Sequence, residues 1–234
     1  MSIDPLISQI EPLDETAMAA ARARQDQLTK PRGSLGQLEA LSIQLAGIYG
    51  RPLPEIHRLV VVTMAGDHGV VAEGVSAYPQ EVTPQMVLNF LHGGAAINVL
   101  ARHVGADVVI VDMGVAADLP PHPGLVDQRV APGTENLAAG PAMTRQQALQ
   151  ALEAGADVAQ AQLDRGMDML GLGEMGIGNT TPSTAIAAVL TGRPPAEIAG
   201  RGTGVDDEGL ERKVAALDRA LVINEPDPTD GLDV

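Results

Sequence analysis

Three apolar runs, each followed by a polar segment that contains glycine, constrain the fold of this chain more than any other feature. They lie within "RLVVVTMAGDHGV", "ADVVIVDMGV" and "MDMLGLGEMG", the third from Met167 to Leu172. An apolar run that does not alternate with polar residues is typical of a strand buried on both faces of a parallel sheet. Parallel strands are joined by crossover connections, usually helices. We therefore predict an α/β fold with a three-layer, Rossmann-like parallel sheet flanked by helices.

Helix signals separate these runs, and others precede the first of them. We predict helices over residues 14–28, 83–103, 144–165, 182–191 and 206–221, and a long loop over 114–141, which is rich in proline and glycine. Ser34 and Gln37 have the spacing of a capping box. The residues that follow place apolar side chains on one helical face, namely Leu35, Leu38, Leu41, Leu45 and Ile48. The sequence thus predicts a helical N-terminal subdomain over 1–50 and an α/β nucleotide-binding domain over 51–234.

The charge balance and the missing cysteines exclude several classes of protein. The chain has 15 Lys and Arg against 30 Asp and Glu, for a net charge of −15. Nucleic acids and anionic membranes bind clustered basic residues, so we expect neither as a partner. There is no cysteine for disulfides or thiolate metal sites, and no apolar run approaches the roughly 18 residues of a membrane span. We expect a cytoplasmic protein.

Asp67-His68 lacks a third ligand, so we predict no metal site.

The stretch "MLGLGEMGIGNTTPSTA" contains Gly171-x-Gly173-x-x-Gly176, the spacing of the dinucleotide fingerprint. Thr181 and Pro182 are a typical helix start, with Thr181 as cap, and the amides and dipole of a helix N-terminus favour an anion. A dinucleotide domain, however, places this loop after its first strand and needs an acidic residue on a second strand about 20 residues later. Here the loop comes late, and Glu197 stands in "RPPAEIAG", which is no central strand. We favour the phosphate of another ligand, and an NAD-dependent dehydrogenase domain is the alternative.

Two charged residues have competing interpretations. Glu174 lies inside the predicted glycine loop, where it is either a general base with a pKa raised by burial or a solvent-facing acid. Lys213 lies on a charged helix, where a solvated position is the default interpretation.

The segments "AGDHG", "DMG" and "GEMGIGNTT" all follow the carboxyl ends of predicted strands. Open α/β sheets bind ligands at that edge, so we expect the site there.

Five motifs together resemble one family. "LTKPRGSLGQLE", "MAGDHGV", "GVSAYPQEVT", "GLGEMGIGNTT" and "GRGTGVDDEGLERK" occur in the order typical of nicotinate-nucleotide:dimethylbenzimidazole phosphoribosyltransferases. The resemblance implies transfer of phosphoribosyl from nicotinate mononucleotide to 5,6-dimethylbenzimidazole, giving α-ribazole 5′-phosphate and nicotinate in the assembly of cobalamin. The resemblance also implies a homodimer. It implies no cofactor, because the pyridinium of the donor is already a cationic leaving group. A non-catalytic nucleotide-binding module is a further alternative.

The resemblance also implies roles for individual residues. Glu174 would be a catalytic base, and Tyr78, Met86 and Met175 would line the benzimidazole pocket. The phosphate and ribose would be held by Gly173, Gly176, Gly178, Asn179, Thr180, Gly202 and Lys213. The family continues beyond residue 234 with a second glycine-rich segment that bears the glutamate usually assigned as base. We therefore expect that the C-terminal part of the family fold is absent here and that these 234 residues turn over little substrate.

Overall fold

The computed structural model describes residues 3–234, which fall into two compact units. Residues up to His57 form the first unit, and Arg58–Val234 form the second. The sequence predicted a boundary after residue 50. Residues 1 and 2 of the predicted N-terminal segment lie outside the described residues.

The N-terminal unit is helical, with α1 (Ile3–Ile7), α2 (Glu15–Gln27) and α3 (Gln37–Tyr49). Helix α2 begins where predicted, because Asp14 accepts a hydrogen bond from the Ala17 amide at 2.9 Å. The capping box predicted at Ser34 is wrong. Helix α3 starts after Gly36, whose φ of +55° turns the chain, and no side chain caps it. Leu35 precedes α3, and the predicted apolar face of the helix is largely exposed, at Leu38, Leu41 and Ile48.

The second unit is built on a four-stranded sheet of order β3-β2-β1-β4 in which every pair is parallel. The strands are β1 (Leu59–Gly66), β2 (Asp107–Gly114), β3 (Leu125–Asp127) and β4 (Met169–Met175). The α/β fold is thus confirmed. Strand β3 lies inside the predicted loop over 114–141 and corrects that prediction. It pairs only with Ile110–Asp112, and so short an edge strand leaves no apolar run in the sequence.

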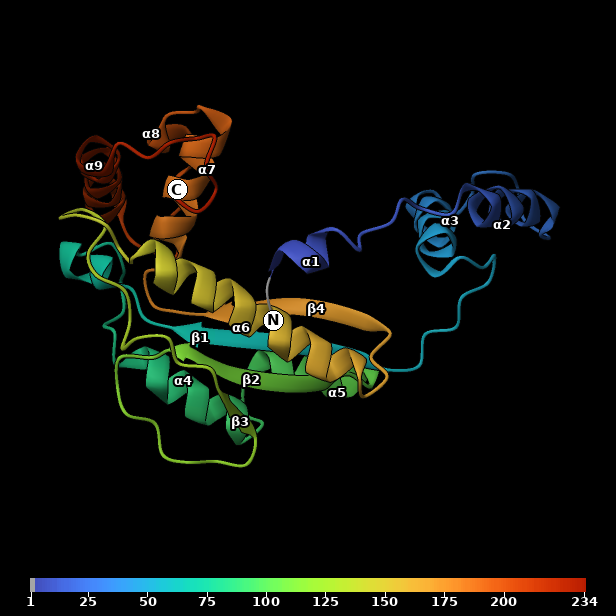
Figure 1. Cartoon of the computed structure of the whole chain (residues 1–234), viewed down its shortest axis with the longest axis horizontal. Coiled ribbons are helices and arrows are strands. Elements are labelled where there is room, and N and C mark those ends of the chain that lie inside the picture. The colour runs from blue at the N-terminus through green and yellow to red at the C-terminus, as the bar shows by residue number, and fades with distance from the viewer. Residues whose placement is uncertain (1–2) are drawn as a thin grey trace. The chain divides into compact units, whose positions relative to one another are not determined.

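Helices cover both faces of the sheet, as Figure 1 shows. Helix α6 (Arg145–Leu163) packs Val158 against Val60 and Val62 on one face. Helix α4 (Val82–Leu91) packs Val87 and Phe90 against the other face. These are the three predicted layers.

The helix predicted over 83–103 is two helices, α4 and α5 (Ala96–Val104). Gly93 has a φ of +75°, which ends α4, and the Asn98 side chain accepts from the Ala95 amide and donates to the Phe90 carbonyl at the break. The remaining elements are the 3₁₀ turn η1 (Gly69–Glu73), α7 (Thr180–Thr191), α8 (Pro195–Ile198) and α9 (Asp207–Asn224). Among residues 3–234, no helix combines the length and apolar character needed to cross a membrane.

Candidate functional site

Strand β4 runs through the glycine motif and continues to Met175. Gly171 lies on the strand, as predicted, but Gly173 and Glu174 also lie on it and not in a loop, which corrects the prediction. A β-carbon at Gly173 would stand 3.0 Å from the Thr63 hydroxyl, so this glycine allows close packing on β1. A dinucleotide fingerprint needs its first glycines in the turn. Here only Gly176 is in the turn, and the dinucleotide interpretation has no structural support.

The turn from Gly176 to Asn179 connects β4 to α7, and two of its amides are already bonded within the protein. Ile177 donates to the Thr83 hydroxyl, and Asn179 donates to the Gly176 carbonyl at 3.0 Å. Among the described residues, the amides of Gly178 and Thr180 have no hydrogen-bond acceptor. These two donors lie at the N-terminus of α7, where an anion is favoured.

The predicted cap of α7 is wrong. The helix begins at Thr180, after Asn179, and the Thr181 hydroxyl is buried without a partner among the described residues. Pro182 still falls in the first turn, where its missing amide costs nothing.

Lys213 is fully buried, which corrects the interpretation of a solvated lysine. Its Nζ donates to the Thr180 hydroxyl at 2.6 Å and to the Gly200 carbonyl at 3.0 Å. Burial lowers the pKa of Lys213. Because the Thr180 oxygen accepts from the ammonium, its own hydrogen is left to donate elsewhere. The cation therefore lies behind Thr180 and polarises its hydroxyl.

Gly202 approaches the same hydroxyl and also the Lys213 ammonium. It has a φ of +53°, and a β-carbon there would stand 2.7 Å from Thr180 Oγ1 and 3.4 Å from Lys213 Nζ. A pocket of about 290 Å³ adjoins this contact. Its lining is rich in hydroxyl and glycine residues, namely Thr180, Ser183, Thr184, Ile198, Gly200 and Gly202. The pocket is large enough for a phosphate with part of a sugar.

Glu174 is linked to the same turn through Asn179. Partial burial raises the pKa of Glu174, and a hydrogen bond from the Asn179 side chain opposes the shift. The carboxylate keeps an exposed side. The structure thus places Thr180, Gly202 and Lys213 together, and Glu174 approaches the same turn through Asn179.

The predicted base pocket is only partly assembled. Met86 and Met175 pack against the same apolar cluster, on the α4 face of the sheet. Successive residues of a strand point to opposite faces, so Glu174 and Met175 diverge. Tyr78 is exposed, and its segment is tied to the Gly202 loop because the Ala77 amide donates to the Thr203 hydroxyl at 2.9 Å. Tyr78 is not part of the apolar cluster that Met86 and Met175 border.

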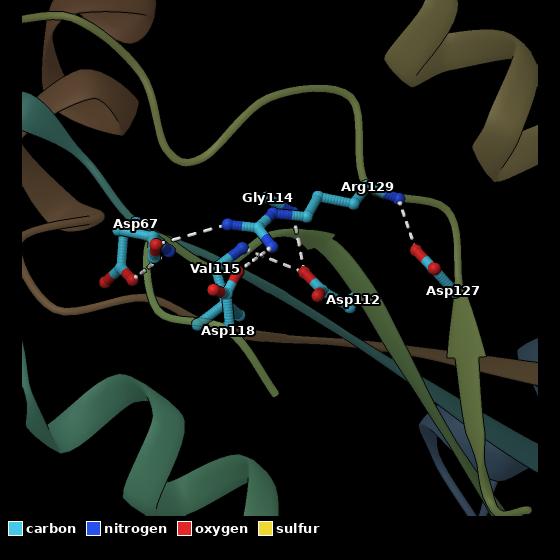
Figure 2. Close-up of polar contacts among 8 residues, drawn as sticks. Asp67, Asp112, Gly114, Val115, Asp118, Asp127 and Arg129 are labelled. Atoms are coloured by element: carbon cyan, nitrogen blue, oxygen red, sulfur yellow. Dashed lines mark hydrogen bonds and ion pairs between the residues drawn. The ribbon is translucent and has the colours of Figure 1, made fainter. Parts of the chain in front are cut away.

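Figure 2 shows a polar network at the carboxyl ends of β1 and β2 that sequence reasoning missed. Asp112 accepts from the amides of Gly114 and Val115, and Asp67 accepts from the Ala116 amide at 2.8 Å. Arg129 donates to the Ala116 carbonyl and to Asp118. The signal in the sequence for such a network is a carboxylate at the end of a buried strand, here Asp67 and Asp112. It fixes the loop after β2 beside the end of β1.

No set of three or more His, Asp or Glu side chains in residues 3–234 is arranged to hold a metal ion. A second pocket, of about 300 Å³, lies near the amino end of β2 and is lined by Arg102, Asp107 and His122 among others. It contains none of the predicted site residues.

Comparisons with known proteins agree with the sequence motifs. A family model described as a phosphoribosyltransferase, DBI_PRT, matches residues 10–234. A Roseiflexus protein named nicotinate-nucleotide–dimethylbenzimidazole phosphoribosyltransferase is 60% identical over 228 residues, which are 97% of this chain and 65% of the relative. A Chloroflexus aurantiacus protein of the same name is 57% identical over 232 residues, covering 99% of this chain and 66% of its own length.

A solved structure gives the same result. The crystal structure of CobT from Thermus thermophilus is 55% identical with a TM-score of 0.86, over 88% of this chain and 62% of that one. The chain thus spans about 65% of the length of its curated relatives. It belongs to the DBI_PRT phosphoribosyltransferase family, in agreement with the resemblance of its motifs.

Proposed function

We propose that this chain takes part in transferring phosphoribosyl from nicotinate mononucleotide to 5,6-dimethylbenzimidazole, the reaction that its relatives' name describes. The observation that carries the proposal is the cluster around Thr180. One hydroxyl is polarised by the buried Lys213, flanked by Gly202 and adjoined by the unpaired Thr180 amide. Such a cluster suits a phosphate group better than a neutral ligand. We assign the nucleotide phosphate to it.

Glu174 is the proposed base of this chain. A benzimidazole nitrogen forms a bond to the anomeric carbon while the bond from that carbon to the pyridinium nitrogen breaks. The electron pair of the broken bond neutralises the pyridinium, and nicotinate leaves. The new benzimidazolium then loses its ring N–H proton to the carboxylate of Glu174. Partial burial raises the pKa of Glu174, which strengthens it as a base.

The acceptor base is proposed to lie toward Met86 and Met175. Both side chains border one apolar cluster, and methionine packs well against flat rings through its sulfur. The chain has one Phe, two Tyr and no Trp, so few aromatic rings are available for stacking. Tyr78 is proposed to close this pocket from the exposed segment beside Thr203. The homodimer and the cytoplasmic location stay predictions, and light scattering of the purified protein measures the first.

Isothermal titration with nicotinate mononucleotide, NAD and dimethylbenzimidazole tests the function. We expect binding of the mononucleotide and of the benzimidazole, and weak or no binding of NAD. Binding of NAD alone would favour the dehydrogenase alternative. Binding of the mononucleotide with no α-ribazole 5′-phosphate formed, in a chromatographic assay with both substrates, would favour a non-catalytic module.

A further inference from the structure

His68 lies beside the turn that carries the proposed phosphate site. A β-carbon at Gly176 would stand 2.9 Å from Nε2 of His68 and 2.3 Å from the Gly66 carbonyl oxygen. The imidazole therefore packs directly on the first residue of the turn, and no side chain larger than glycine fits between them. Neither nitrogen of the ring has a hydrogen-bond partner among residues 3–234.

The backbone of His68 is held firmly although its side chain is unpaired. His68 forms a parallel bridge with Thr134, and the Gly69 amide donates to the Thr134 carbonyl at 3.1 Å. The Asp67 amide donates to the Gly114 carbonyl on the other side. A ligand contact needs a firmly held backbone, and here such a backbone presents an unpaired imidazole beside the turn. Burial also lowers the pKa of His68, with the Asp67 carboxylate opposing the shift, so the ring is neutral at pH 7.

The position of the ring along the turn indicates which part of a ligand it meets. The bond from the Asn179 amide to the Gly176 carbonyl closes the turn, so Gly176 lies close to Asn179 and to Thr180, which follows it. Lys213 polarises Thr180 at one end, and His68 covers Gly176 at the other. A sugar that extends from a phosphate at Thr180 along the turn would reach Gly176 and His68. A neutral imidazole has one donor and one acceptor, and a sugar hydroxyl can satisfy both, whereas a phosphate dianion offers only acceptors.

We propose that His68 is a substrate-contacting residue that hydrogen-bonds a ribosyl hydroxyl of the nucleotide whose phosphate lies at Thr180. The assignment rests on the function proposed above. It adds a sugar contact from the β1 side to a phosphate site built from α7, α9 and the Gly202 loop.

Titration calorimetry with ribose 5-phosphate, nicotinate mononucleotide and inorganic phosphate tests the assignment. We expect His68→Ala to weaken binding of the two sugar phosphates by about fivefold to tenfold, the usual loss for one hydrogen bond. Inorganic phosphate should bind the variant and the wild type equally. His68→Gln, which keeps a donor and an acceptor, should recover most of the affinity. His103→Ala removes an exposed histidine on α5 and serves as the matched control.

The outcomes separate the two proposals. If the wild type binds the sugar phosphates and His68→Ala binds them equally well, the contact is wrong and the function stands. A parallel loss of inorganic phosphate would show that the ring only supports the turn, which also overturns the contact. If the wild type binds neither ribose 5-phosphate nor the mononucleotide, the proposed function itself fails, and the contact with it.

Discussion

At the scale of single residues, the site depends on how closely Gly202 approaches Thr180. Both Gly202 and Gly204 have positive φ angles, +53° and +93°, but only Gly202 has side-chain atoms within 4 Å of the place where a β-carbon would stand. The two positions therefore separate backbone strain from steric contact with the site.

We expect Gly202→Ala to abolish phosphate binding, because its methyl group would displace the Thr180 hydroxyl. Gly204→Ala bears similar strain, about 1–2 kcal/mol for an alanine forced to positive φ, and should keep its phosphate affinity. Calorimetric titration of both variants with inorganic phosphate measures the difference. Equal affinities in the two variants would contradict the placement of the anion at Thr180.

Glu174 gives a prediction for stability against pH. Its pKa is raised in the folded protein, mainly by burial. The folded state thus favours the protonated acid, and this contribution to stability is complete below the unfolded value of 4.5 and is lost as the pH rises through the folded value. Glu174→Gln, which stays neutral, should gain stability relative to the wild type between pH 4 and 7. Urea unfolding at several pH values measures the gain.

Asp230 supplies a control of opposite sign. Its pKa is lowered, first by a hydrogen bond from Arg145 and then by the Leu232 amide. Asp230→Asn should therefore be less stable than the wild type at pH 7, with the deficit shrinking as the pH falls through the lowered pKa. The pair is exposed, so the effect is small. The same trend in both variants would indicate that unfolded-state charge, and not burial of Glu174, controls the result.

At the scale of elements, the end of β2 depends on one buried carboxylate. Asp112 accepts from the amides of Gly114 and Val115, and it is 4% exposed. We expect Asp112→Ala to lower the free energy of unfolding by about 1–3 kcal/mol, because two amides lose their acceptor. Asp112→Asn keeps an acceptor and should recover part of the loss. Asp118→Ala removes a fully exposed partner of Arg129 and should have little effect in the same urea unfolding experiment.

The elements that the sequence predicted well are those with an unbroken local signal. The apolar runs locate β1 and β2, and Thr144 and Asp206 begin α6 and α9 as caps, with Thr144 in a true capping box. Where glycine interrupts the pattern, the prediction fails in both directions. Gly173 was assigned to a loop but lies in β4, where it packs on Thr63. Gly93 was assigned to a continuous helix but ends one.

The burial of Lys213 is a failure of a different kind. Its partners, Thr180 and Gly200, come from distant parts of the chain, so no local pattern predicts them. A weaker signal was present, because Lys213 falls on the helical face of α9 that also carries Ala216, Leu217 and Ala220, all buried. The position of a lysine on an apolar helical face therefore predicts its burial better than its charge predicts exposure.

At the scale of the whole molecule, the site residues are confined to one of the two units. Every residue assigned to phosphate, sugar or base lies within Arg58–Val234. In the N-terminal unit, the Lys30 ammonium forms an ion pair with Glu39 at 2.6 Å, so it is poorly placed to bind a phosphate anion. We expect a fragment of residues 58–234 to bind inorganic phosphate with the affinity of the whole chain. A folded fragment, judged by circular dichroism, that fails to bind would show that the N-terminal unit contributes to the site.

Strand β4 pairs with β1 on one side, and no strand of the described chain pairs with its other side, where Leu172 is 81% exposed. The turn from Gly176 to Asn179 stands at the end of this edge strand, so the described residues surround a ligand there from β1, α7, α9 and the Gly202 loop and leave the free edge of β4 open. The consequence concerns time. A ligand that no lid encloses leaves as soon as its few hydrogen bonds break, whereas an enclosed one waits for a segment to open. In this chain we expect phosphorus NMR of a half-saturated sample to give one averaged resonance, and two separate resonances would reveal slow exchange.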